Sequence, residues 1–259
     1  MKTYAINLKK ETQRREYIRN LLEPYEFIDL EFVEGLDASI ANIENLKDIF
    51  NIEKCNKHLY RSVTKPEIGC TISHHRCYKK FLRSNEDLCL ILEDDIDTPA
   101  DAFGDIIEKI PSQFNTSSPM IILLSDWYWF TKEKKRITEN YEIVNVFNGY
   151  LAHAYIINRA AAEILIREKP DCIADEWGQI RKKGILIYAV LPHIIQQKWD
   201  GSFKTSIQNQ RPVNSSYRLI NFIRLLPERL YQFYLKKTNR FYAPHEMRTD
   251  ENRNKAANN

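Results

Sequence analysis

Glycine is scarce in this chain, with seven residues among 259. Their spacings match neither G-x-G-x-x-G nor G-x-x-x-x-G-K-[ST], the two glycine-rich loops that hold phosphates against backbone amides. These absences exclude a dinucleotide-binding loop of that type and a P-loop. Any phosphate that the protein binds must therefore be held by a metal ion or by basic side chains.

Patterns for disulfides, zinc and membrane spans are also missing. The five cysteines contain no C-x-x-C pair, and we expect scattered, mostly buried thiols in a reducing compartment. No stretch approaches the roughly 18 apolar residues of a membrane-spanning helix, and no secretory signal is visible at the N-terminus. We therefore expect a cytoplasmic protein, with peripheral attachment to the inner face of the plasma membrane left open.

The chain has no large excess of charge of either sign, because 38 Lys and Arg residues nearly balance 35 Asp and Glu residues. The net charge of +3 gives no reason to expect a nucleic-acid partner. Basic and apolar residues do gather between Tyr217 and Tyr242, at helical spacings. This pattern is typical of an interfacial helix on an anionic inner-membrane surface. A pair of amphipathic helices packed against the main domain explains it equally well.

The order of the predicted elements indicates an α/β fold with a central mixed sheet flanked by helices. Apolar runs predict strands over residues 4–8, 27–33, 88–92, 120–124 and 185–191. Periodic patterns predict helices over residues 13–22 with Thr12 as cap, 42–50, 66–83, 159–167 and 172–183. Residues 141–146 and 150–157 flank Asn148-Gly149 and are predicted to form a hairpin.

These elements divide the chain into three parts. We expect a main domain over residues 1–215 and a basic amphipathic helical region over residues 216–247. Residues 248–259 are polar without any periodic pattern, and we expect them to be a disordered tail.

Carboxylates follow the predicted strand at 88–92 without a break. Glu93, Asp94 and Asp95 are consecutive, and alternation along a strand would direct Glu93 and Asp95 to one side and Asp94 to the other. Like charges packed together raise each other's pKa unless a cation lies among them. Oxygen ligands at the carboxyl edge of a sheet suit Mg²⁺ or Mn²⁺ carrying substrate phosphates. A solvated acidic turn before the next helix is the competing explanation.

Other motifs stand in a fixed order around this acidic strand end, along residues 1–206. They are Ile6-Asn7-Leu8 followed by Arg14-Arg15, the run from Glu67 to His74 containing G-C-x-x-S-H, Leu90-Ile91-Leu92-Glu93-Asp94-Asp95, Ala154-Tyr155-Ile156-Ile157 leading into Arg159-Ala160-Ala161-Ala162, and Asp175-Glu176. Together they resemble glycosyltransferase family 25, which includes bacterial lipooligosaccharide and collagen galactosyltransferases. One departure is Pro66, where the family usually has glycine before Glu67.

The resemblance implies a GT-A-like nucleotide-sugar-binding fold and an inverting, metal-dependent transferase. Such an enzyme would move a hexose, galactose more often than glucose, from a UDP-sugar to a lipid-linked lipooligosaccharide or lipopolysaccharide glycan. It implies Mn²⁺ or Mg²⁺ held by Glu93 and Asp95, with His193 as a candidate third ligand. A structural role for a lone histidine after a strand is the commoner case.

The resemblance also implies roles in catalysis and donor binding. Asp175 is the expected base that deprotonates the acceptor hydroxyl, with Glu176 in reserve. Both acids could instead occupy the first turn of a helix, where the dipole favours them. The expected donor-binding residues are Asn7, Leu8, Arg14, Ser73, His74, Asp94 and Gly149. Ser73 and His74 could equally be a buried polar pair on their helix, and Gly149 could simply form a turn.

Two other classes of protein use similar residues. A metal-dependent phosphodiesterase or nuclease would employ Glu93, Asp94 and Asp95, but it needs further acids or histidines on neighbouring strands, and Asp126 is the available candidate. A carbohydrate- or membrane-binding module with an acidic turn would need no catalytic base. The motifs favour the transferase over both.

Overall fold

The structure is a computed structural model and describes residues 1–97, 99–114, 117–198, 226–237 and 241–242. The predicted tail at 248–259 and much of the predicted basic helical region lie outside the described residues. The strands are β1 (Lys2–Asn7), β2 (Asp29–Glu34), β3 (Leu88–Glu93), β4 (Met120–Leu123), β5 (Tyr128–Arg136), β6 (Glu142–Gly149), β7 (Ala154–Asn158), β8 (Leu186–Leu191) and β9 (Phe241–Tyr242). The helices are α1 (Thr12–Leu22), α2 (Ile43–Ile49), α3 (Ile52–Leu59), α4 (Lys65–Phe81), α5 (Phe103–Gln113), α6 (Arg159–Ile166), α7 (Trp177–Arg181) and α9 (Leu226–Lys237), with a 3₁₀ turn at Ala38–Ile40.

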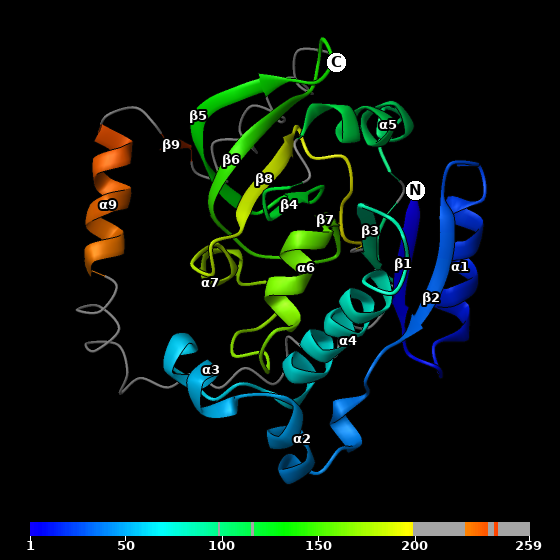
Figure 1. The fold of residues 1–259 in the computed structure, drawn as a ribbon, viewed down its shortest axis with the longest axis vertical. Helices are drawn as coiled ribbons and strands as arrows, with labels where there is room; N and C mark the ends of the chain where they lie inside the picture. The colour runs from blue at the N-terminus through cyan, green and yellow to red at the C-terminus, as the bar shows by residue number, and fades with distance from the viewer. Residues whose placement is uncertain (98, 115–116, 199–225, 238–240, 243–259) are drawn as a thin grey trace.

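The described strands form one mixed sheet in the order β2-β1-β3-β7-β4-β8-β6-β5-β9 (Figure 1). β1 runs parallel to both β2 and β3, and β4 runs parallel to β8. β7 lies antiparallel between β3 and β4, and β6 is antiparallel to both β5 and β8. This topology confirms the predicted fold class, an α/β fold with a central mixed sheet flanked by helices.

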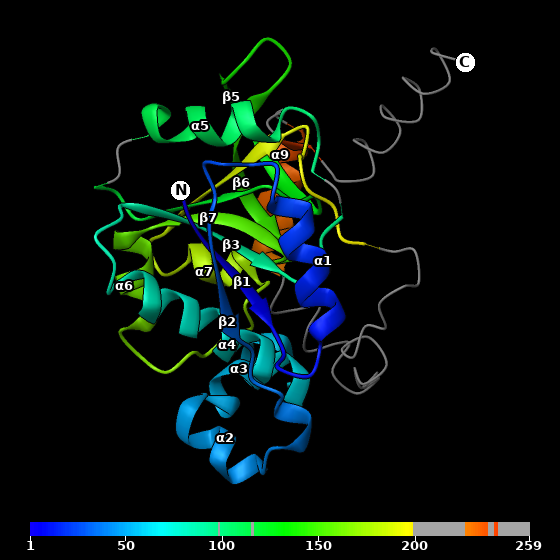
Figure 2. The ribbon, with the colours of Figure 1, turned by 90° about the vertical axis from the view of Figure 1, so that its right-hand side faces the viewer.

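Helices cover both faces of the sheet (Figures 1 and 2). On β3, Cys89 and Ile91 belong to the apolar cluster that includes residues of α4, α6 and α7, whereas Leu88, Leu90 and Leu92 belong to the cluster with α1 and α5. Every residue from Leu88 to Leu92 is buried. Two covered faces explain why this strand reads as a continuous apolar run, because neither face needs polar side chains.

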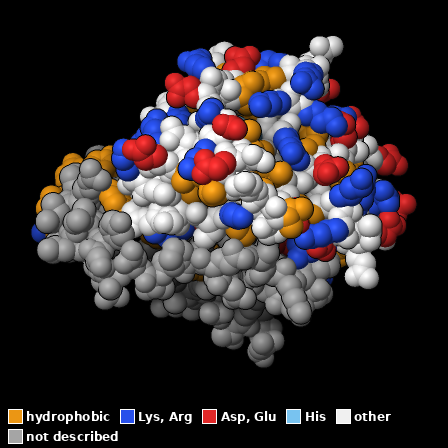
Figure 3. Space-filling model, turned by 90° about the horizontal axis from the view of Figure 1, so that it is seen from below, with side chains coloured by type: hydrophobic (Ala, Val, Ile, Leu, Met, Phe, Trp, Pro, Cys, Tyr) orange, Lys and Arg blue, Asp and Glu red, His pale blue; other side chains and the backbone are white. Residues whose placement is uncertain are grey.

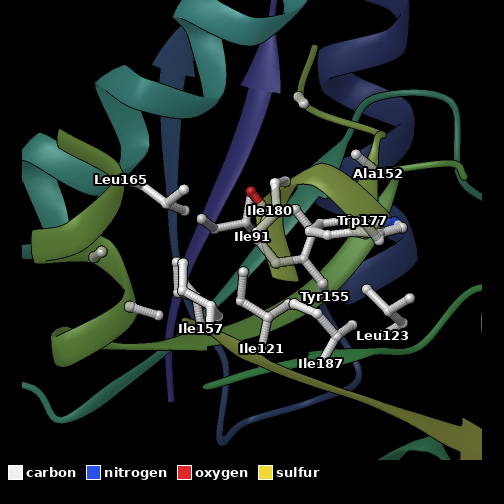
Figure 4. Close-up of a cluster of buried hydrophobic side chains, with 14 of the residues drawn as sticks. Ile91, Ile121, Leu123, Ala152, Tyr155, Ile157, Leu165, Trp177, Ile180 and Ile187 are labelled. Atoms are coloured by element: carbon white, nitrogen blue, oxygen red, sulfur yellow. The ribbon is translucent and has the colours of Figure 1, made fainter. Parts of the chain in front are cut away.

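A close view of the first cluster shows how α7 is anchored to the sheet. The Tyr155 side chain of β7 lies beside Trp177 of α7, with ring centroids 5.1 Å apart at an edge-on angle (Figure 4). The Trp177 indole nitrogen donates a hydrogen bond of 2.9 Å to the Leu151 carbonyl. Trp177 is fully buried and packs in the core, so its ring is not exposed for stacking on a sugar.

α2, α3, the 3₁₀ turn and the start of α4 enclose a smaller apolar cluster that includes Leu46, Phe50 and Ile68. Pro66 lies in the first turn of α4, where proline is tolerated because the amide it lacks would have no partner within the helix. Thr64 caps the helix, and Glu67 completes a capping box with it. Seen from the side of α2 and α3, Lys and Arg side chains are interspersed with Asp and Glu (Figure 3). The described residues on this face therefore form no patch of one charge.

Several predicted elements are wrong in detail. The predicted hairpin around Gly149 does not form, because β6 pairs with β5 and β8 while β7 inserts between β3 and β4. β5 was not predicted, since its charged half gives no alternating signal. Thr12 is the first residue of α1 rather than its cap. Of the helix predicted over 172–183, only the stretch of α7 is helical. Within the predicted helical region at 216–247, the described residues form the helix α9 and the short strand β9, which pairs with β5.

Candidate functional site

A cavity of about 330 Å³ lies at the edge of the sheet where the parallel strands β1 and β3 end. Its lining comes from the β1–α1 connection, the loop after β2, α4, the residues after β3, and the loops before β7 and α7. The predicted site residues that line it are Leu8, Arg14, Ser73, His74, Glu93, Asp94, Asp95 and Asp175. The carboxyl edge of the sheet is the place where ligands bind in open α/β folds.

Asp94 is held by two of the predicted donor-binding residues. Arg14 Nη1 lies 2.9 Å from Asp94 Oδ1, and Asn7 Nδ2 donates a hydrogen bond of 2.7 Å to Oδ2. Burial raises the pKa of the Asp94 carboxyl above its usual value, although Arg14 and Asn7 both oppose the shift. Asn7 is not among the residues that line the cavity. The ion pair between Arg14 and Asp94 ties α1 to the end of β3.

Glu93 faces α4. Its Oε1 lies 3.1 Å from His74 Nε2 and 3.7 Å from Cys70 Sγ. The other ring nitrogen of His74 lies 2.8 Å from the Tyr155 hydroxyl, which is 2.7 Å from the Tyr78 hydroxyl. Burial works to raise the pKa of Glu93, but the hydrogen bond and charge of His74 outweigh it and hold the pKa below its usual value. His74 is fully buried, so the alternative of a buried polar residue on its helix explains its contacts as well as the predicted donor role does.

Asp95 has a different environment. Its Oδ2 accepts a hydrogen bond of 2.7 Å from Gln197 Nε2, whereas Oδ1 is buried with no hydrogen-bond partner among the described residues. Burial, reinforced by the charge of Glu93, raises the pKa of Asp95 to about 7. A buried carboxylate oxygen without a partner is costly unless a cation lies beside it. This observation fits the predicted divalent cation at Asp95.

The two predicted catalytic acids are separated. Asp175 lines the cavity, whereas Glu176 does not. Glu176 occupies the N-cap position of α7 without making a capping hydrogen bond, and its Oε2 is buried with no partner among the described residues. Burial, together with the charge of Asp175, raises the pKa of Glu176 to about 7. Asp175 is therefore the acid in a position to meet a ligand in the cavity.

Replacing Glu176 by Gln is expected to stabilise the protein at pH 8 by about 1–3 kcal/mol and to change little at pH 5. The folded pKa lies above the unfolded one, so ionisation of Glu176 destabilises the fold as the pH rises from about 4.5 to about 7. Glutamine keeps the shape and removes the charge. Urea unfolding of both proteins at the two pH values measures the difference, and a loss of stability at pH 8 would contradict it.

Ser73 joins α4 to the loop after β2. Its hydroxyl donates to the Gly69 carbonyl at 2.6 Å and accepts from the Leu36 amide at 2.8 Å. Gly69 is needed here because a Cβ at this position would lie only 2.5 Å from the Leu36 carbonyl oxygen. The Ser73 hydroxyl is thus engaged by backbone, in line with the buried-polar alternative, and it fixes the loop over the cavity.

Two further predicted residues lie outside the cavity lining. His193 lies after β8, where its Nε2 is 2.9 Å from Gln196 Nε2. Gly149 ends β6, where a Cβ would lie 3.0 Å from the Tyr128 Cβ and 3.3 Å from the Trp177 ring. The structure accounts for Gly149 by this close packing and does not bring it to the other predicted donor residues.

Cys70, His153 and Gln197 also line the cavity and were not predicted as site residues from the sequence. His153 is buried, and its backbone carbonyl accepts a hydrogen bond of 2.8 Å from the Glu93 amide. No motif marks His153 or Gln197, because both reach the site through strand pairing and loop placement. Cys70 could have been found, since it stands four residues before His74 and so shares its helix face.

These features define an α/β protein with a carboxylate-lined ligand cavity at the edge of its sheet. The sequence profile described as glycosyltransferase family 25 (LPS biosynthesis protein) matches residues 1–173. The chain belongs to glycosyltransferase family 25. No helix among the described residues is long and apolar enough to cross a membrane.

Two relatives illustrate the family. A glycosyltransferase 25 family member of Aedes aegypti is 27% identical over 178 residues, covering 64% of this chain and 28% of that protein. Procollagen galactosyltransferase 2 of Homo sapiens is 32% identical over 97 residues, covering 36% of this chain and 15% of that protein. The matched region therefore spans less than a third of either relative.

Among solved structures, apo-UDP-glucose pyrophosphorylase is similar over 76% of this chain and 92% of that chain, with 10% identity and a TM-score of 0.40. Similarity at this level adds nothing to the assignment.

Proposed function

We propose that the protein is an inverting, divalent-metal-dependent hexosyltransferase that uses a UDP-sugar. The observation that carries the proposal is the buried Oδ1 of Asp95, which has no hydrogen-bond partner within the described part of the chain and lies in a cavity that Glu93 and Asp94 also line. A glycosyltransferase without glycine-rich phosphate loops needs another way to bind a diphosphate, and a cation at these carboxylates supplies it. Mn²⁺ or Mg²⁺ held by Glu93 and Asp95 would neutralise the diphosphate and assist departure of the UDP.

The remaining cavity residues receive roles from their positions. Arg14 and Asp94 lie at the β1–α1 end of the cavity, and we assign them with Leu8 to the donor nucleotide and its sugar. Asp175 stands in the cavity wall before α7, and we assign it as the base that deprotonates the acceptor hydroxyl. Inversion needs one such base, since the hydroxyl attacks from the face opposite the leaving UDP.

The donor sugar is proposed to be galactose. The support is the name of the human relative, a procollagen galactosyltransferase, while the family description mentions LPS biosynthesis. On this basis the acceptor is a lipid-linked lipooligosaccharide or lipopolysaccharide glycan. The nuclease alternative is less well supported, because Asp126 does not line the cavity with the three carboxylates.

UDP release tests the proposal. The full-length protein is incubated with Mn²⁺, a glycan acceptor extract and, in separate reactions, UDP-galactose, UDP-glucose or UDP-N-acetylglucosamine. We expect UDP release that depends on both metal and acceptor and is fastest with UDP-galactose. Cleavage of a phosphodiester substrate at a comparable rate, with no UDP release, would contradict the transferase and support the nuclease.

α9 provides a surface suited to a lipid-linked acceptor, and we propose that it rests on an anionic membrane. Leu230 and Phe233 are 58% and 57% exposed, and Tyr231 and Tyr234 are similarly exposed. Tyr231 also contacts Phe147 of β6, with ring centroids 5.4 Å apart, so a side chain of α9 packs against the sheet. The helix therefore combines a point of attachment with apolar side chains that the described residues leave exposed.

Replacing both Leu230 and Phe233 by Glu is expected to lower binding to anionic phosphatidylglycerol vesicles about 10-fold or more, since it removes apolar area and adds negative charge. A pelleting assay measures the bound fraction at low and high salt. The matched control is the replacement of Ile40 and Ile43 by Glu, two exposed apolar residues beside the loop after β2 and far from α9 along the chain. Equal losses in both variants, or binding equally strong to neutral vesicles, would contradict the membrane role.

A further inference from the structure

Cys70, His74 and Glu93 form a compact group of metal-ligating side chains in the wall of the cavity. Their ligand atoms all lie within 4.8 Å of one another. Cys70 and His74 stand one turn apart on α4, facing the end of β3, where Glu93 lies. The group therefore joins two elements that the fold holds rigidly side by side. Of the two residues expected to bind the catalytic cation, Glu93 belongs to this group and Asp95 does not.

The spacing suits a tetrahedral ion with little rearrangement. Zinc bonds of about 2.0–2.3 Å in a tetrahedral site place neighbouring ligand atoms roughly 3.3–3.7 Å apart. Glu93 Oε1 lies 3.1 Å from His74 Nε2 and 3.7 Å from Cys70 Sγ. Both Cys70 and Glu93 line the cavity. Three protein ligands would thus leave a fourth position open toward the cavity.

His74 is oriented as a metal ligand usually is. Its Nδ1 is engaged 2.8 Å from the Tyr155 hydroxyl, which in turn lies 2.7 Å from the Tyr78 hydroxyl. This leaves Nε2 directed at Glu93 and Cys70. A hydrogen bond on the far nitrogen fixes the tautomer and raises the basicity of the ligating nitrogen. The hydroxyls of Tyr155 and Tyr78 therefore hold the His74 ring with Nε2 directed at Glu93 and Cys70.

The chemistry of the three side chains selects the ion. A thiolate and an imidazole favour Zn²⁺, whereas Mg²⁺ prefers oxygen ligands alone. The absence of C-x-x-C argued against a zinc site in the sequence, but that rule counts only ligands close together in the chain. Here one carboxylate comes from a strand nineteen residues beyond His74, at position 93.

We propose that Cys70, His74 and Glu93 form an inhibitory Zn²⁺ site. On binding, the Cys70 thiol releases its proton to solvent and a sulfur–zinc bond forms, with no change in oxidation state. Because Glu93 cannot serve two ions fully, Zn²⁺ at this site displaces the catalytic Mn²⁺ or Mg²⁺. The inhibition, but not the binding, rests on the proposed transferase function.

Cobalt spectroscopy of the full chain tests the binding. One equivalent of Co²⁺ is expected to produce a thiolate-to-cobalt charge-transfer band, which one equivalent of Zn²⁺ abolishes. Cys70→Ala is expected to lose the band. Cys77→Ala is the matched control, because Cys77 lies on the same helix outside the group, and it is expected to keep the band. Tyr155→Phe is expected to keep the band and weaken Zn²⁺ binding about 10–100-fold.

No band in the unaltered protein, or a band that survives Cys70→Ala, would overturn the site. Inhibition is measured separately, as the Zn²⁺ concentration that halves the Mn²⁺-dependent rate of each variant relative to its own uninhibited rate. That concentration is expected to rise about 10-fold or more in Cys70→Ala and not in Cys77→Ala. An unchanged concentration would overturn the competition. If no variant transfers sugar, the proposed function fails while the cobalt band still decides the zinc site.

Discussion

Replacing Asp95 by Asn is expected to lower the rate of sugar transfer about 10²–10³-fold and, at the same time, to make the metal-free protein more stable above pH 7. The rate falls because asparagine cannot hold a cation beside the diphosphate as a carboxylate does. The stability rises because the charge of Asp95 is buried and its Oδ1 has no partner among the described residues. Residues that are essential for binding often destabilise the protein when its ligand is absent.

The pH dependence of that stability follows from the direction of the shift. The folded pKa of Asp95, about 7, lies above its unfolded value. Its ionisation therefore costs stability as the pH rises from about 4 to about 7, and the gain from Asn appears in full above that range. Thermal unfolding in EDTA at pH 5 and pH 8 measures it. Asp101→Asn, an exposed acid before α5, is the control, and an Asp95→Asn protein that keeps its rate would contradict the account.

Replacing Arg14 by Ala is expected to reduce the free energy of unfolding by about 2–4 kcal/mol. The side chains of Arg14 and Asp94 are only 15% and 11% exposed. Removing the guanidinium therefore leaves the Asp94 carboxylate buried, with Asn7 as its remaining side-chain partner among the residues that the structure describes. Donor binding is expected to weaken as well, because Arg14 and Asp94 both line the cavity. Urea unfolding and UDP titration measure the two effects.

A double-mutant cycle separates this pair from a general effect of truncating α1. Arg14→Ala combined with Asp94→Ala is expected to cost clearly less than the sum of the single changes, since no unpaired charge remains. Arg15→Ala is the matched control: Arg15 is exposed and lies over the Phe32 ring at 4.5 Å, and its loss should cost no more than about 1 kcal/mol. Additive losses in the cycle would show that Arg14 and Asp94 are not coupled.

The parts of the fold that the sequence predicted well are those whose pattern depends on burial alone. β3 is buried on both faces, so the sequence shows a continuous apolar run that stops at Glu93. The carboxylates after that run could therefore be predicted to lie at the end of a strand. The predicted hairpin failed because Asn148-Gly149 is a good turn signal locally. Strand pairing depends on partners far along the chain. β7 pairs with two central strands, β3 and β4, instead of with β6 as the turn signal predicted.

The candidate site shows the same division. Residues that follow β1 and β3 line one cavity, because parallel neighbouring strands end at the same edge of the sheet. The contacts of those residues could not be read from the sequence. Asp94 contacts Arg14 of α1, Glu93 contacts His74 of α4, and Asp95 contacts Gln197 in the segment after β8. Three consecutive carboxylates therefore face three different segments of the chain. Strand alternation could not predict this, because β3 ends at Glu93 and the residues after it follow a turn.

Isothermal titration with UDP tests the central claim, that a cation at Glu93 and Asp95 binds the diphosphate. The full-length protein is titrated with UDP in Mn²⁺ and again in EDTA, alongside Asp95→Asn and the Asp101→Asn control. The account predicts binding in Mn²⁺ that EDTA abolishes, that Asp95→Asn loses and that Asp101→Asn keeps. Equally tight binding of UDP in EDTA, or in Asp95→Asn with Mn²⁺, would contradict it.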